Sequence, residues 1–254
     1  MRTSSQVSSS ALPVLAVASG KGGVGKSSVA VGLAKALHTR GLAVGLVDAD
    51  LYGPDVPRML GLRRDKPATS IRISGFGERG APLDPVEVDG LQVVSAGFLL
   101  GGTQGLAVGS GVAEMLLARL LNETRWGAPD VLVVDLPPGT ADLGQALMSL
   151  VRRLMVVLVV TPAEVAHLDT GRLVTVLRRA EVRILGGVQN MAYLDCPDCA
   201  RRVALHPRTP DERTIWAMGV ARLAELPYRV DSGPSAEDLR GLAAAVHAQL
   251  PAVL

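Results

Sequence analysis

The run Ser19-Gly20-Lys21-Gly22-Gly23-Val24-Gly25-Lys26-Ser27-Ser28 decides which fold this chain is expected to adopt. It follows an apolar stretch, residues 13–18, that is typical of a buried strand, and it precedes residues 29–39, which show the periodicity of an amphipathic helix. A glycine-rich turn between a strand and a helix lets consecutive backbone N–H groups converge on a phosphate at the positive end of the helix dipole. The sequence therefore predicts a phosphate-binding loop.

The spacing within this loop narrows the prediction to a nucleotide. Gly20 and Gly25-Lys26-Ser27 match the pattern G-x-x-x-x-G-K-[ST], in which the lysine reaches the β- and γ-phosphates and the hydroxyl group binds Mg²⁺. We therefore expect Mg²⁺ at Ser27. The residues expected to bind the nucleotide are Gly20, Lys21, Gly22, Gly23, Val24, Gly25, Lys26, Ser27 and Ser28.

The composition predicts a core built from aliphatic side chains. Of the 254 residues 48% are apolar but only 3% are aromatic, which suits the aliphatic strands of a parallel sheet that is covered on both faces. No apolar stretch reaches the length of a membrane span, and the N-terminus lacks the apolar segment of a signal peptide. The formal charge of +2 is not gathered into a basic run, so nucleic acid is not an expected partner. These features favour a cytoplasmic protein.

Strands and helices alternate along the chain without a break in composition. This order predicts an α/β fold with a single doubly wound, mainly parallel sheet and helices on both faces. We expect residues 1–12 to form a disordered tail and residues 13–254 to form a single ATPase domain. Asp89-Gly90 predicts a tight hairpin between residues 86–88 and 91–94. Capping-box patterns at residues 161–164, 209–212 and 235–238 predict three helix starts.

Three acidic residues stand at or just beyond the carboxyl ends of predicted strands. Asp48 and Asp50 follow the strand at residues 43–47, and Asp135 follows the strand at residues 131–134. Ligands of open α/β sheets bind at this edge, and an acid after an apolar strand is where such enzymes hold Mg²⁺. The position predicts that the acids face the phosphates, although a solvated turn is an alternative for Asp48 and Asp50.

The chain has two cysteines, Cys196 and Cys199, in the run Cys196-Pro197-Asp198-Cys199. This spacing is compatible with metal or cluster binding, with a redox dithiol, or with no chemistry at all. A [4Fe–4S] cluster or a closed tetrahedral metal site needs four ligands, and one chain supplies two. A two-fold dimer would bring four thiolates together, so a shared metal centre predicts a homodimer.

Several runs, taken together, resemble one family. Lys21 ahead of Lys26 makes the loop similar to the deviant P-loop, or deviant Walker A, of the MinD/ParA class of dimeric ATPases. Within that class, the chain resembles the Mrp/ApbC family of iron–sulfur cluster carriers from about Val14 to the last helix. The runs that carry this likeness are Asp48-Ala49-Asp50-Leu51-Tyr52-Gly53-Pro54-Asp55, Asp135-Leu136-Pro137-Pro138-Gly139-Thr140-Ala141-Asp142, Thr161-Pro162-Ala163-Glu164-Val165-Ala166, Asn190-Met191 and Cys196-Pro197-Asp198-Cys199.

The resemblance implies a role for each site residue. By it Lys26 binds the β/γ-phosphate, Ser27 binds Mg²⁺, and Lys21 reaches the nucleotide of a partner subunit. It also implies that Asp50 orients the attacking water, that Asp135 holds Mg²⁺ from its second shell, and that Asn190 recognises adenine. We place Asp48 close to the Mg²⁺.

The family likeness thus implies a homodimeric ATPase that carries a [4Fe–4S] cluster, bridged by Cys196 and Cys199 of each subunit, to apo iron–sulfur proteins or an assembly scaffold. The expected cofactors are ATP and Mg²⁺ together with this cluster. A second interpretation is a positioning or partitioning switch of the MinD/ParA kind without a cluster. Residues 243–254 hold no lysine or arginine, which weakens a membrane-binding version of that switch. A third is a slow ATPase that regulates a partner and whose cysteines are vestigial.

Overall fold

The computed structural model describes residues 12–51, 53–62, 82–98, 110–139, 141–207, 209–229 and 233–250. Most of the predicted tail, much of the segment 63–85 and much of the glycine-rich segment 97–111 lie outside this range. Leu12, which the prediction placed in the disordered tail, is 4% exposed and packs into the core, so it does not belong to such a tail.

The described residues form alternating strands and helices, as predicted. Their bounds in chain order are β1 Val14–Ala18, α1 Lys26–Thr39, β2 Val44–Asp48, α2 Val56–Met59, β3 Val86–Val88, β4 Leu91–Ser95, α3 Ser110–Asn122, β5 Val131–Asp135, α4 Ala141–Leu150, β6 Leu154–Val160, α5 Glu164–Arg179, β7 Arg183–Asp195, β8 Arg202–Ala204, β9 Arg222–Pro227 and α6 Arg240–His247. Short 3₁₀ turns lie at Ala96–Phe98 and Asp211–Arg213.

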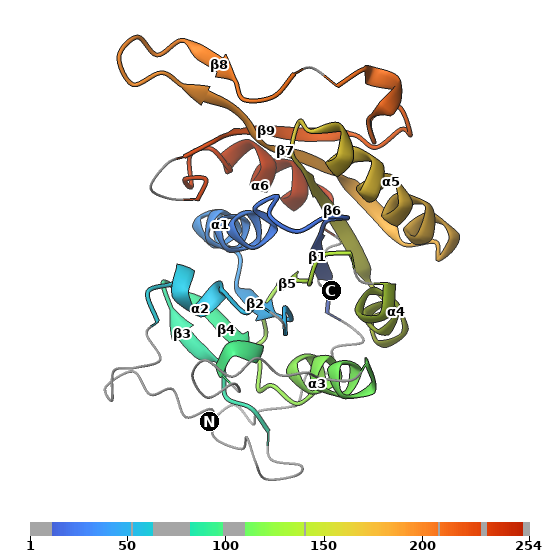
Figure 1. The fold of residues 1–254 in the computed structure, drawn as a ribbon. Helices are drawn as coiled ribbons and strands as arrows, with labels where there is room; N and C mark the ends of the chain where they lie inside the picture. Colours follow the sequence, from blue (N-terminus) through green and yellow to red (C-terminus); the bar gives the residue numbers. More distant parts are fainter. Residues whose placement is uncertain are drawn as a thin grey trace.

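In the described part of the chain, nine strands form one sheet (Figure 1). Its order is β3-β4-β2-β5-β1-β6-β7-β8, and β9 pairs with β7. The pairing is parallel except at the edge strands β3 and β8. This is the doubly wound, mainly parallel sheet that the sequence predicts, and it brings the carboxyl ends of β1, β2 and β5 side by side.

Helices cover both faces of the sheet (Figure 1). Helices α1, α2 and α6 lie on one face and α3, α4 and α5 on the other, and each layer closes its own buried core. The strands β1, β2 and β5 are buried along their whole length, as expected for aliphatic strands between two helical layers. Within the described residues, no helix is both long enough and apolar enough to span a membrane.

The predicted hairpin and one of the three predicted capping boxes are confirmed. The hairpin at Asp89-Gly90 forms as predicted, with positive φ at both residues, as a tight two-residue turn requires. At the pattern 235–238, the Asp238 N–H donates to Ser235 Oγ and the Ser235 N–H donates to Asp238 Oδ2, which is the reciprocal bonding of a capping box, although α6 itself begins only at Arg240.

The capping boxes predicted at residues 161–164 and 209–212 do not form. Helix α5 begins at Glu164 after Ala163, and no side chain caps it. Residues 209–212 start a 3₁₀ turn at Asp211 instead of an α-helix, because the Thr209 hydroxyl donates to the Pro162 carbonyl across the fold. At Thr209 a tertiary contact thus replaces the local one that the pattern predicted.

One buried histidine links α5 to the segment that precedes β9. His167 is 2% exposed; its Nδ1 accepts the Ile215 N–H at 3.3 Å, and its ring meets that of Trp216 edge-on at a centroid distance of 5.6 Å. Burial, helped by the nearby Arg222 guanidinium, lowers the pKa of His167 to about 4. The neutral ring is therefore the form that the folded protein holds.

We expect this histidine to make stability depend on pH. The unfolded chain binds a proton at His167 below about pH 6.5 while the folded chain does not, so the free energy of unfolding should fall as pH drops from about 6.5 towards 4, by up to about 3 kcal/mol. Urea unfolding at several pH values would measure this fall. His167→Gln, which keeps an acceptor for the Ile215 N–H, should show a flatter profile; parallel profiles would contradict the assignment.

Candidate nucleotide site and cysteine pair

The loop between β1 and α1 has the backbone conformation that a phosphate-binding loop requires. Gly23 and Gly25 adopt φ angles of 80° and 79°, which only glycine adopts readily. Gly25 is the residue before α1, and its carbonyl accepts the Val29 N–H at 3.0 Å, so the helix begins directly at the end of the loop. The free N–H groups of the first helical turn therefore face the place where phosphates bind.

The start of the loop rests on two other elements. The Gly20 N–H donates to Thr170 Oγ1 on α5 at 3.1 Å, and a Cβ at Gly20 would lie 2.3 Å from the backbone of Asp169 and Thr170. The Gly139 N–H, beyond the end of β5, donates to the Ser19 carbonyl at 3.0 Å. The loop is therefore held between α5 and the segment that follows Asp135.

Lys26 lies among the predicted acids at this edge of the sheet. Its Nζ donates to Asp135 Oδ1 at 2.6 Å, is 3.8 Å from Asp50 Oδ2, and is 3.2 Å from Ser27 Oγ. The Lys26 and Asp50 side chains are 6% and 12% exposed, and the Asp135 side chain is fully buried. The strand order, with β5 between β1 and β2, brings together these residues from three separate stretches of the chain.

Asp48 lies next to this group and is completely buried. It is opposite Asp135 in the parallel register of β2 and β5. Its two oxygens accept from the Ser95 hydroxyl at 2.7 Å and from the Asp50 N–H at 3.2 Å. Burial and then the neighbouring Asp135 raise the pKa of Asp48 to about 8, even though both hydrogen bonds stabilise the carboxylate. Burial also raises the pKa of Asp135, and the Lys26 ammonium opposes that rise.

The residues at this site fit Mg²⁺ bound together with nucleotide phosphates. Asp135 Oδ2 is buried and has no hydrogen-bond partner among the described residues, which leaves one carboxylate oxygen for a metal or its water. No group of three or more Asp, Glu, His or Cys side chains in the described ranges is arranged to hold a metal alone. Mg²⁺ is commonly held by one or two protein groups, waters and substrate phosphates, which suits Ser27, Asp135 and Asp48.

Lys21 differs from Lys26 in its surroundings. It lies in the exposed part of the loop, and its ammonium has no ion-pair partner within the described part of the chain. Its carbonyl accepts from the Ser19 hydroxyl at 2.9 Å. Lys21 is therefore available to a group outside this chain.

Asn190 contacts the loop from β7. Its side chain is 3% exposed, its Nδ2 donates to the Val24 carbonyl at 2.9 Å, and a Cβ at Gly25 would lie 2.3 Å from the same nitrogen. The role in adenine recognition that the resemblance implies stays a prediction.

The cysteines lie just beyond the end of β7, in the turn of the hairpin that β7 makes with β8. This hairpin, residues 193–204, is called the arm here and projects at the upper left of Figure 1. Cys196 and Cys199 are unbridged; Cys196 is partly exposed and Cys199 exposed. Hydrogen bonds from the backbone N–H groups of Cys199 and Asp198 lower the pKa of the Cys196 thiol, which favours the thiolate that binds iron.

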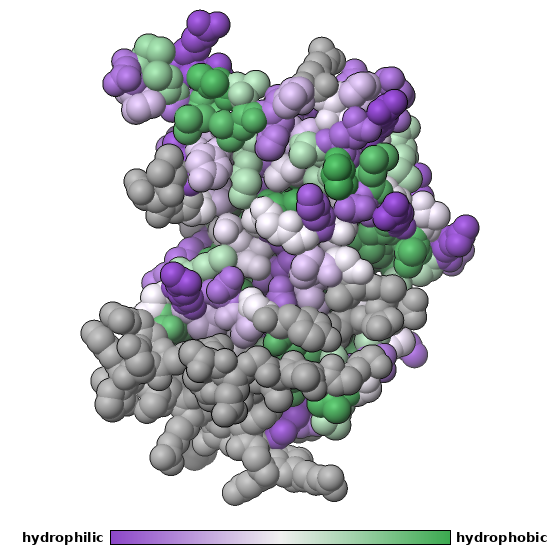
Figure 2. All heavy atoms as spheres, in the orientation of Figure 1, coloured by the Kyte–Doolittle hydropathy of each residue, from purple (hydrophilic) through white to green (hydrophobic). Residues whose placement is uncertain are grey.

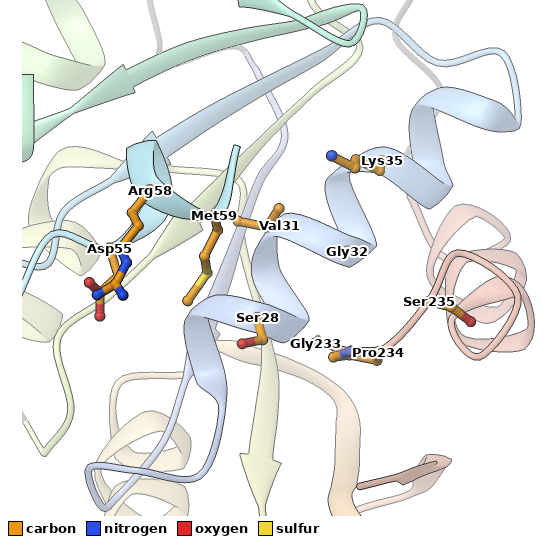
Figure 3. Close-up of a pocket in the computed structure, with 10 residues that line it drawn as sticks. All are labelled: Ser28, Val31, Gly32, Lys35, Asp55, Arg58, Met59, Gly233, Pro234 and Ser235. Atoms are coloured by element: carbon orange, nitrogen blue, oxygen red, sulfur yellow. The ribbon is translucent and has the colours of Figure 1, made fainter. Parts of the chain in front are cut away.

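A cavity of about 600 Å³ adjoins the site on the outer side of α1 (Figure 3). It lies between α1, α2 and residues 233–235, and Met59 and Arg58 of α2 stand across from Val31 and Ser28 of α1. Ser28 is its only wall residue from the phosphate-binding loop; Lys26, Asp50 and Asp135 do not line it. The cavity therefore borders the phosphate-binding loop at Ser28 and is separate from the phosphate site.

Two contacts and one backbone conformation at the site were not predicted. Ser95 binds Asp48, Thr170 binds the Gly20 N–H, and Met191 has a left-handed backbone, with φ 53°. Ser95 stands at the end of a predicted strand, and this position could have marked it. No sequence signal identifies Thr170, because its partner is 150 positions away.

A nine-stranded, mainly parallel sheet with a glycine loop, a buried lysine and acids at the ends of neighbouring strands defines a P-loop NTPase of the deviant Walker A kind. The match to a family model agrees with this class and is more specific. The chain belongs to the ParA family described as NUBPL iron-transfer P-loop NTPase, whose model matches residues 11–249.

Curated relatives carry names that refer to iron–sulfur clusters. An iron–sulfur cluster carrier protein of Haemophilus influenzae is 37% identical over 217 residues, which cover 85% of this chain and 56% of that protein. An iron–sulfur cluster transfer protein NUBPL of Dictyostelium discoideum is 36% identical, over 85% of this chain and 65% of that protein. The chain thus matches 56% of the length of the first of these relatives and 65% of the length of the second.

Solved structures agree with the fold. A nucleotide-binding protein of Archaeoglobus fulgidus, in complex with ADP, superposes with a TM-score of 0.70 at 30% identity and covers 94% of this chain and 92% of its own. The cell division ATPase MinD of Pyrococcus furiosus superposes with a TM-score of 0.63 at 24% identity, over 93% and 98% of the two chains. At 24% identity, the likeness to MinD is evidence for the fold and for nothing further.

Proposed function

We propose that this protein is an ATP-hydrolysing carrier of iron–sulfur clusters that acts as a homodimer in the cytoplasm. The observation that carries the proposal is the combination, in one chain, of a complete P-loop site with an exposed, unbridged Cys-x-x-Cys at the end of an arm. The names of the relatives support the same combination. Neither half alone would separate a carrier from a nucleotide-dependent switch.

For ATP hydrolysis we assign roles by position. Lys26 leaves its ion pair with Asp135 to bind the β/γ-phosphates, and Asp135 and Asp48 then face the metal side with Ser27. Mg²⁺, when bound, neutralises phosphate charge and so favours transfer of the γ-phosphoryl group to water. Asp50, 3.8 Å from Lys26 Nζ, orients that water. Lys21, exposed on the loop, completes the site of the partner subunit and stabilises the charge that develops on the leaving phosphate.

The cluster is the cargo of this proposed reaction. A [4Fe–4S] cluster takes four thiolates, and the chain holds two cysteines, so two arms related by a two-fold axis would hold one cluster between them. The exposed position of Cys199 leaves the cluster accessible to an acceptor. The recipients are apo iron–sulfur proteins or an assembly scaffold, whose own cysteines would take over the ligation.

Anaerobic reconstitution tests this proposal. The wild-type protein, treated with iron and sulfide under reducing conditions, should retain about four iron and four sulfide per dimer. The Cys196→Ala/Cys199→Ala variant should retain only the background amount and should still bind Mg-ATP, because the arm is remote from the P-loop. If wild type and variant held equally little iron, the carrier function would be refuted, and a nucleotide-dependent switch would be the better interpretation.

A further inference from the structure

Strand β7 carries residues of both functional regions. Asn190 bonds to the P-loop at Val24 and Met191 lies beside Gly25, while Cys196 comes directly after the last residue of the strand, five positions after Met191 and up to roughly 17 Å further at about 3.3 Å per residue. The nucleotide site and the cysteine pair are therefore joined by one short, continuous stretch of backbone.

That stretch is interrupted where it meets the loop. The described ladders pair β7 with β6 as far as Gln189, and with β9 at residues 187–189 and again at Tyr193. Asn190, Met191 and Ala192 have no partner in any of these registers, and Met191 adopts the left-handed φ of 53°. Such strained positions persist only where the surroundings enforce them, and they gather at functional sites. Residues 190–192 are called the junction here.

The arm beyond the junction is a braced unit. Tyr193, Leu194 and Asp195 pair with Ala204, Val203 and Arg202, and the Arg202 guanidinium lies 4.2 Å from the centre of the Tyr193 ring. The turn is closed by the Cys196 N–H to the Arg201 carbonyl at 3.0 Å and by the Ala200 N–H to the Cys196 carbonyl at 2.8 Å. Figure 2 shows the same region standing out from the body. A change at the junction would move this hairpin as a whole.

Two residues of the junction, Asn190 and Met191, lie against the P-loop. Asn190 Nδ2 donates to the Val24 carbonyl at 2.9 Å, and a Cβ at Gly25 would lie 3.3 Å from Met191 Cε. Val24 and Gly25 are the residues whose backbone must be in place for the phosphates. Nucleotide binding at the loop therefore acts on the residues that set the direction of the arm.

From this geometry we infer that Met191 is a positioning residue: its side chain beside Gly25, together with its left-handed backbone at the junction, transmits nucleotide occupancy of the P-loop to the orientation of the Cys196–Cys199 arm. The biological use of this linkage rests on the proposed function, because nucleotide binding could then expose or hold a cluster on the arm. The contact itself does not depend on a cluster. It can therefore be tested on the cluster-free protein.

The test measures the reactivity of the thiols towards a maleimide in the reduced, cluster-free protein, with and without saturating Mg-ADP. Because Cys196 and Cys199 are the only cysteines, all labelling reports on the arm. We expect Mg-ADP to change the labelling rate of the wild type by at least about fivefold. Met191→Gly relieves the left-handed strain and removes the side chain against Gly25, so the effect should fall below about twofold at an Mg-ADP concentration that saturates the variant.

Ala200→Gly is the matched control. Ala200 also has a left-handed φ, 55°, and lies directly after Cys199, but its recorded contacts are within the arm. This variant should alter the basal labelling rate and keep the full response to Mg-ADP. If Met191→Gly does not fold, Met191→Asn, which tolerates the left-handed backbone but lacks the thioether, carries the same expectation.

A wild type that binds Mg-ADP without a change in labelling rate would overturn the inference, and so would a Met191→Gly variant with the full response. Iron and sulfide content, measured on separate samples, decides the carrier function. The two results are independent, so a failed carrier function and a failed linkage remain distinguishable.

Discussion

Replacing Lys26 by alanine is expected to weaken the binding of Mg-ATP by at least about 100-fold, because a buried, charge-assisted contact to phosphate is lost. In the structure the Lys26 ammonium is buried and lies 2.6 Å from Asp135 and 3.8 Å from Asp50, at the carboxyl edge of the sheet. Isothermal titration calorimetry would measure the loss. An unchanged affinity would refute the assignment of the loop as the phosphate site.

Two controls separate binding from folding in this experiment. Lys35→Ala removes a lysine from the same helix whose side chain is 37% exposed and pairs with Asp89, so it should leave affinity unchanged. Lys26→Ala also leaves Asp135 buried without its cation, which destabilises the folded state. Lys26→Ala/Asp135→Asn removes that charge. This double variant should recover the free energy of unfolding. Its affinity for ADP, measured in EDTA so that no metal contributes, should stay low.

Gly20→Ala is expected to lower the free energy of unfolding by about 3 kcal/mol, as overpacking against immovable atoms does. The new Cβ would lie 2.3 Å from the Asp169 carbonyl carbon and the Thr170 nitrogen, which belong to the backbone of α5 and cannot rotate away. The loop or α5 must shift, the bond from the Gly20 N–H to Thr170 is strained, and affinity for Mg-ATP should fall with stability. Urea unfolding and calorimetry would measure both losses.

Other glycines of the same loop supply the comparison. A Cβ at Gly22 meets its nearest atom, on Pro138, at 3.8 Å, which is ordinary contact, so Gly22→Ala should be close to neutral. Gly23 has open space around it but a φ of 80°, so Gly23→Ala should cost about 1 kcal/mol through backbone strain alone. A Gly20→Ala variant as stable as Gly22→Ala would contradict the packing of the loop against α5.

The sequence by itself determined the features that depend on neighbours along the chain. The strand–loop–helix at residues 14–39 follows from periodicity and glycine spacing, and the hairpin at Asp89-Gly90 follows from turn chemistry. Asp48 and Asp135 were placed at strand ends because apolar runs stop there. The helix start predicted at residues 161–164 is confirmed without its side-chain cap, whereas the α-helix predicted from residues 209–212 is wrong, because Thr209 bonds to Pro162 instead.

Only the tertiary structure decided which of these pieces meet. No local sequence pattern determines the order of the strands in the sheet. The position of β5 between β1 and β2 brings Asp135 to Lys26 and places it opposite Asp48. The contacts of Gly20 with Thr170 and of Val24 with Asn190 join residues 150 and 166 positions apart. The sequence thus specified the phosphate loop and the cysteine pair, and long-range packing determined that one strand, β7, connects them.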